Sequence, residues 1–133
     1  MKRIIIFLSG ILFFLNVLPA QESVRFDDYF VDKTMRIDYF HTGDAQQEWV
    51  TVDQFYQQGI WVGSRRNLID NFNNGRYAIK IYDSSSGELI FSKGFDSYFG
   101  EYRTTTQALE GKKRTYHESA LIPFPKRKIT FAV

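Results

Sequence analysis

The chain has 133 residues, of which 17 are lysine or arginine, 15 are aspartate or glutamate and none is cysteine. Without cysteine there is no disulfide framework, no thiolate nucleophile and no cysteine-ligated zinc site. This length fits one domain, which buries about two-thirds of the surface that its unfolded chain exposes.

The first 20 residues have the three parts of a cleavable signal peptide. Residues 1–3 are Met-Lys-Arg, residues 4–18 are almost all apolar, and residues 19–20 are Pro-Ala. A transmembrane anchor needs roughly 20 apolar residues, and this run is shorter. We therefore expect residues 1–20 to be removed on export. Residues 21–133 would then be periplasmic, on the cell surface or secreted, with no stable membrane anchor.

Removal of this leader changes the charge of the protein. Lys2 and Arg3 are two of the 17 basic residues, so residues 21–133 carry 15 basic and 15 acidic residues. Two short basic clusters, at 112–114 and 126–128, are interpreted as solvated loops. A nucleic-acid-binding protein would show a strong clustered positive excess, and we therefore expect no nucleic-acid partner.

Alternation of apolar and polar residues predicts six short strands after the leader. They cover residues 34–39, 48–53, 76–83, 88–95, 115–122 and 128–133. The third and fourth form a hairpin around the Ser-Ser-Ser-Gly turn at 84–87. These strands indicate a mostly β fold, an antiparallel β-sandwich with one or two short helical turns.

The segments between the strands are predicted from turn and capping residues. A helix is expected at 104–110, with Thr104 or Thr105 as its cap and Gly111 as its end. Residues 41–44 are expected to turn. Residues 123–125 (Pro-Phe-Pro) are also expected to turn, because proline cannot donate to a strand ladder. Two segments stay open: residues 67–72 have helical spacing among turn formers, and residues 21–27 form a polar lead-in.

His117-Glu118 is the pair closest to a catalytic motif. Zinc peptidases use H-E-x-x-H on a helix, where two histidines one turn apart hold the metal and the glutamate activates water. Position 121 is leucine here, and the strand pattern places His117 and Glu118 on opposite faces. We therefore expect no metal or other cofactor, and a His117 that hydrogen-bonds within the sheet.

Other catalytic patterns are absent from the sequence. There is no G-x-S-x-G nucleophile motif and no phosphate-binding glycine loop. The acidic residues that a fold could pair are interpreted as solvated; they are Asp27, Asp28, Asp96 and Glu101.

Aromatic residues suggest a binding surface as an alternative to chemistry. Sugars stack on exposed aromatic faces, and five residues could form such a platform. They are Trp49, Trp61, Tyr98, Phe99 and Tyr102. Because aromatic residues are so dense in this chain, the core is the favoured place for each of them.

A series of short phrases resembles the N-terminal domain of the IgA-peptidase family of secreted bacterial zinc metallopeptidases (peptidase family M, number sixty-four). The phrases occur in order along the mature chain. They are FDDYF at 26–30, TMRIDY at 34–39, IWVGS at 60–64, GRY at 75–77, YD at 82–83, SG at 86–87, SKGFD at 92–96, FGEYRTT at 99–105, YHES at 116–119 and PFPK at 123–126.

The resemblance implies a β-sandwich-like domain that precedes a separate metallopeptidase domain. In that family the zinc ligands and the catalytic glutamate belong to the later domain, so no catalytic or metal-binding residue is assigned here. The chain is interpreted as a non-catalytic accessory domain, with a metallopeptidase domain or its protein substrate as partner. Either a truncated or stand-alone gene product, or a piece of a longer protein, would explain its length.

Two other functions stay open. The chain could be an exported glycan- or protein-binding module, or an orphaned remnant with an apolar patch where a catalytic domain should dock. The candidate interface residues are Trp61, Tyr98, Tyr102 and His117.

Overall fold

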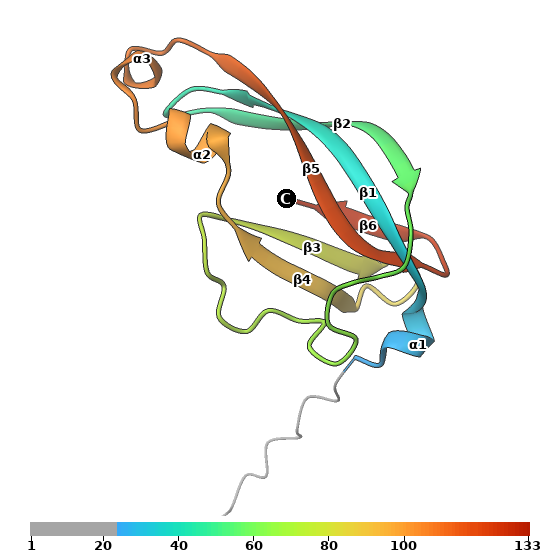
Figure 1. Cartoon of the computed structure of the whole chain (residues 1–133). Helices are drawn as coiled ribbons and strands as arrows, with labels where there is room; N and C mark the ends of the chain where they lie inside the picture. The colour runs from blue at the N-terminus through green and yellow to red at the C-terminus, as the bar shows by residue number, and fades with distance from the viewer. Residues whose placement is uncertain (1–23) are drawn as a thin grey trace, which may run out of the picture.

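The computed structural model describes residues 24–133, so the predicted signal peptide lies outside the described residues. The elements follow one another as α1 (Phe26–Tyr29), β1 (Phe30–Gly43), β2 (Glu48–Gln57), β3 (Tyr77–Asp83), β4 (Leu89–Phe95), α2 (Tyr98–Tyr102), α3 (Thr106–Leu109), β5 (Arg114–Pro125) and β6 (Ile129–Ala132). The fold is a β-sandwich with short helices, as the sequence predicts (Figure 1). Within residues 24–133, no helix is long and apolar enough to cross a membrane.

The sandwich consists of two antiparallel three-stranded sheets. The first sheet has the order β2-β1-β5 and the second has the order β4-β3-β6. Figure 1 shows the two sheets as separate layers, with α1 at one end and α2 and α3 at the other. The long central strand β1 pairs with β2 on one side and with β5 on the other.

The core lies between the two sheets and draws on both of them. Ile37 and Ile122 from the first sheet and Ile81 and Ile90 from the second are almost fully buried. In β1 the inward positions alternate with polar positions, which is why the period-two pattern located this strand correctly. A second, smaller cluster around Phe99 lies beneath α2 and α3.

Two predicted turns are wrong. The Pro-Phe-Pro segment at 123–125 belongs to β5 and pairs with β1. Because β5 is an edge strand, its prolines need no donor on the open side, and this is where strands tolerate proline. Residues 41–43 also belong to β1, and the turn starts at Asp44, whose Oδ1 accepts from the backbone N–H groups of Gln46 and Gln47.

The helices are partly as expected. Thr105 caps α3 by accepting from Ala108 N at 3.3 Å, and Gly111 follows the helix with a φ of +82°. The helices α1 and α2 were not predicted, and residues 67–72 form loop rather than helix. At α2 the cap is Ser97, whose hydroxyl accepts from Gly100 N at 3.1 Å.

Candidate functional site

The four candidate interface residues lie in different environments. Trp61 is half-buried in the loop between β2 and β3, and packs against the main core. Tyr98 is exposed at the start of α2, whereas Tyr102 is buried in the smaller cluster and donates to Lys112 O. His117 is half-exposed on β5. The structure therefore does not bring the four together into one surface.

His117 lies on the outer face of the first sheet. Its Nε2 is 3.2 Å from Asp53 Oδ2 on β2, and its ring stacks on Phe40 with the centroids 4.8 Å apart. The next residue, Glu118, points to the inner face and contacts His41. The opposite orientations of His117 and Glu118 are those that the strand pattern predicts.

A cavity lies beside the loop of residues 58–76. It has a volume of about 680 Å³. Trp61, Leu68 and Phe91 line its apolar part, and polar side chains from the same loop, including Asn67 and Asn71, line the rest. Figure 1 shows this loop running from the end of β2 past the second sheet to the start of β3.

Short-range hydrogen bonds fix the shape of this loop. Ser64 Oγ accepts from the backbone N–H groups of Arg66 and Asn67, and the Trp61 indole donates to Ser64 O at 3.1 Å. Asp70 accepts from three backbone N–H groups, the closest being that of Gly94 on β4 at 2.8 Å. These hydrogen bonds hold the pKa of Asp70 below its usual value, and the bond from the backbone N–H of Gly94 has the largest effect.

The outer part of the loop carries three exposed apolar side chains. They are Ile60, Val62 and Phe72, and the exposed fractions of Val62 and Phe72 are 86% and 84%. Patches of such exposed groups commonly mark an interaction site, and Ile60 and Val62 are only two residues apart in the chain. We call these three residues the loop rim.

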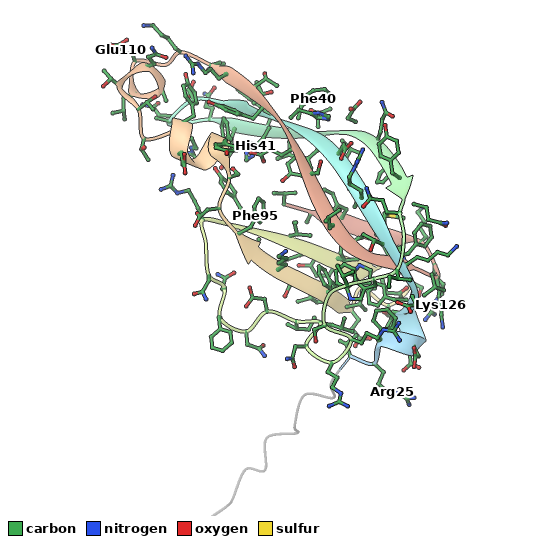
Figure 2. The ribbon with its side chains drawn as sticks, in the orientation of Figure 1. Arg25, Phe40, His41, Phe95, Glu110 and Lys126 are labelled. Atoms are coloured by element: carbon green, nitrogen blue, oxygen red, sulfur yellow. The ribbon has the colours of Figure 1, made fainter. Side chains whose placement is uncertain are left out.

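A buried polar cluster, which the sequence analysis did not single out, lies at the other end of the sandwich. Its centre is His41, only 1% exposed. The His41 Nδ1 is 3.2 Å from Glu118 Oε2 on β5, and its Nε2 is 3.1 Å from Glu48 Oε2 on β2. Figure 2 shows His41 beside α2, with its neighbour Phe40 on the opposite face of the sheet.

The glutamates of this cluster bind further groups. Glu48 accepts from Tyr77 Oη at 3.0 Å and from an Arg103 guanidinium nitrogen at 2.9 Å. Glu118 also accepts from the backbone N–H of Phe99, whose ring lies over that of His41 at 3.9 Å between centroids. The cluster thus joins β1, β2, β3, β5 and α2.

The electrostatics of the cluster favour a structural role. Burial raises the pKa of the Tyr39 hydroxyl, and the nearby Glu118 carboxylate raises it further. Burial also raises the pKa of Tyr77. Both nitrogens of His41 lie within hydrogen-bond distance of a glutamate oxygen, and the ring is enclosed by the surrounding side chains.

The described residues contain no assembled metal site. No group of three or more histidine, cysteine, aspartate or glutamate side chains within residues 24–133 could hold a metal ion.

The sequence contained a weak signal for the polar cluster around His41. In the alternating pattern of the strand, His41 falls on the same inward face as Ile37 and Tyr39, and this position predicts that His41 is buried.

Comparison with known proteins gives the family. No curated protein matches the chain. The family model described as Peptidase M64 N-terminus matches residues 25–133, which include all but one of the residues that the structure describes. The match covers the whole sandwich and the expected family resemblance is confirmed. The chain therefore belongs to the Peptidase M64 N-terminus family.

Proposed function

We propose that this chain is the non-catalytic accessory domain of a secreted zinc metallopeptidase of the IgA-peptidase type. In this role it packs against a peptidase domain, or recruits protein substrate for it, by surface complementarity. The single observation that carries the proposal is the family match over residues 25–133, which assigns the entire sandwich to the N-terminal domain.

The arrangement of polar groups supports this role. The buried histidine is held between two glutamates and the exposed one pairs with Asp53, so both act as cross-links between strands. General acid–base catalysis needs a group within reach of a substrate proton, and His41 is enclosed.

The loop rim is the surface best suited to the contact. Phe72 lines the 680 Å³ cavity, and Ile60 and Val62 flank Trp61, which lines it too. Burial of these exposed apolar side chains in a complex would favour association. The hydrogen bonds of Ser64 and Asp70 hold the loop in shape. A loop already ordered in the free domain loses little conformational entropy on binding.

The test adds the purified chain to a separately purified catalytic domain of a family member. We expect calorimetric binding and a higher kcat/KM on a protein substrate. Val62→Asp and Phe72→Asp should abolish both effects, because each places a charge in the contact. Leu109→Asp on α3 is the matched control, since Leu109 is also exposed but lies at the other end of the sandwich.

Two outcomes would contradict the proposal. One is the absence of binding and of any change in kcat/KM. The other is zinc-dependent, chelator-sensitive cleavage of protein by the chain alone.

A glycan-binding module is the second candidate function. The observation that favours it is the cavity itself, because Trp61, Asn67 and Asn71 are all among its lining residues. Sugar sites combine an aromatic wall with a few polar groups that fix orientation. Binding on a glycan array that Trp61→Ala removes would support this function, and silence of the array would exclude it.

A further inference from the structure

The two sheets have four edges, and three of them are protected against pairing with another chain. The loop covers β4, where Ser92 N donates to Leu68 O at 2.9 Å. The edge strand β5 contains Pro123 and Pro125, which have no backbone N–H to donate. The strand β6 is only four residues long. Covering, proline and short length are the devices with which natural sheets block their edges.

In the part of the chain that the structure describes, the fourth edge, β2, is not covered, is not short and contains no proline; its only protections are a bulge at Asp53 and two acidic side chains. It is ten residues long, every one of its residues is exposed, and within residues 24–133 it pairs with β1 alone. It contains no lysine, arginine or proline. Its one irregularity is the register shift opposite Asp38 and Tyr39, which leaves Asp53 as the extra residue.

Three apolar side chains of β2 lie on the inner face of the sheet but remain exposed. They are Val50, Val52 and Phe55, which pair with His41, Tyr39 and Ile37 of β1. The exposed fractions of the three β2 residues are 38%, 40% and 60%, whereas their three partners are at most 1% exposed. The inner face of the first sheet is therefore buried along β1 but remains exposed along β2.

The side chains of β2 follow a pattern that is nearly the same in both directions. Consider two copies of β2 paired antiparallel and centred on Val52, with the extra residue Asp53 left out of the count. Each side chain then faces one of similar chemical type: aliphatic or aromatic residues face each other, and polar residues face each other. The pairs would be Val52 with Val52, Val50 with Phe55, Trp49 with Tyr56, Thr51 with Gln54 and Glu48 with Gln57. No two like charges face each other, which cross-strand pairing requires.

The two acidic side chains of β2 each have a partner inside one copy. Glu48 pairs with Arg103 and His41, and Asp53 pairs with His117. In the register above, Glu48 faces Gln57 rather than another carboxylate. A two-fold contact brings the same surface of both subunits together, so the absence of directly facing like charges favours self-association.

We propose that β2 binds β2 of a second copy of this chain, antiparallel and centred on Val52, to form one continuous six-stranded sheet across a two-fold axis. The unpaired backbone of β2 supplies the hydrogen bonds, and the matched apolar pairs set the register. The proposal is independent of the accessory role, because the loop rim and β2 are different surfaces.

The first experiment is a disulfide test of the register. The chain has no cysteine, so Val52→Cys introduces a single thiol that would face itself across the axis. Directly opposed strand residues have Cα atoms about 4.5–5.5 Å apart, within the range that a disulfide spans. Mild oxidation should give a covalent dimer on a non-reducing gel. In this register Trp49 faces Tyr56 rather than itself, so Trp49→Cys should give little covalent dimer on the same gel.

The second experiment measures the dimer itself by sedimentation velocity of the whole chain. Val52→Lys opposes two positive charges and should raise the dimer Kd at least about tenfold. Leu121→Lys, at an exposed apolar position on the other edge strand of the same sheet, should leave it unchanged. Unaltered thermal midpoints would show that both variants fold.

A chain that sediments as a monomer at all concentrations and forms no Val52→Cys dimer would overturn the proposal. So would a monomer whose β2 instead binds the catalytic domain and loses that binding in Val52→Lys. Failure of the loop-rim variants would leave this result unaffected, so the two proposals fail separately.

Discussion

The two ends of the sandwich are held together by different forces. At the end near α1, which we call the apolar end, Phe26 and Phe30 pack with the aliphatic core. At the end near α2 and α3, the polar end, a histidine, two glutamates and an arginine are joined by directed hydrogen bonds beneath aromatic rings. The stability of the apolar end depends on close packing of side-chain volume, whereas the stability of the polar end depends on hydrogen-bond partners.

The difference follows from one strand. Along β1 the inward positions change from Ile37 through Tyr39 to His41, all almost fully buried. A buried aliphatic group needs only close packing, whereas a buried imidazole needs a partner at each nitrogen. We therefore expect a loss of volume to destabilise the apolar end most. At the polar end, we expect the loss of a charge or of a hydrogen-bond partner to be destabilising even when the volume is unchanged.

The largest expected effect is the loss of volume at the apolar end. Phe30 is 1% exposed, and its ring centroid is 5.7 Å from that of Phe26. Phe30→Ala should lower the free energy of unfolding by about 3–5 kcal/mol, measured by urea denaturation. Phe72→Ala, at an exposed position, should change it by less than about 0.5 kcal/mol. A similar small change in Phe30→Ala would contradict the volume argument.

The second effect tests the polar end at constant volume. Glu118→Gln keeps the shape of the side chain but removes the charge that faces His41. We expect a loss of about 2–3 kcal/mol, because hydrogen bonds to charged groups contribute most. The control is Glu110→Gln, whose partner Lys112 is exposed. An unchanged stability in Glu118→Gln would mean that packing alone holds this end.

The sequence predicted the regular strands better than the buried polar cluster around His41. The hairpin of β3 and β4 and the strand β1 follow from local alternation, which any half-buried strand must show. The contacts of His41 across the fold come from residues 48, 77, 99 and 118, and no local pattern encodes such neighbours. Gly43 and Asp44 were also misleading, because their turn signal was extended backward over His41.

The prolines at 123 and 125 show a second limit of sequence reading. Proline indicates a turn unless the strand lies at an edge, and strand order is a property of the whole fold. If the edge position of β5 had been known, residues 123–125 could have been assigned to the strand rather than to a turn.

A smaller effect concerns the cap of α3 at the polar end. Thr105→Ala removes the acceptor for Ala108 N and should cost about 1 kcal/mol. Thr105→Ser keeps a hydroxyl and should recover most of this loss. Amide exchange of Ala108 should accelerate in the alanine variant only. Equal exchange in both variants would show that packing of Ala108, rather than the cap, holds α3.

The smallest effect is a pH dependence at the turn beside α3. Hydrogen bonds from Lys113 and from the backbone of Gln46 and Gln47 lower the pKa of Asp44 to about 2. A depressed carboxyl pKa stabilises the fold above the unfolded value of about 3.9, and this contribution disappears as the pH falls through 2. Because Lys113 is half-exposed, water screens the pair and keeps the contribution small.

Asp44→Asn isolates this contribution. The pKa values of Asp38, Asp70 and Asp83 are also lowered, so acid destabilises both proteins through these shared groups. The difference in unfolding free energy between wild type and Asp44→Asn cancels them. Urea denaturation should show that difference at pH 7 and pH 5, and it should narrow between pH 4 and pH 2. A difference independent of pH would mean that Asp44 acts through the shape of its turn alone, and that its pair with Lys113 adds no stability.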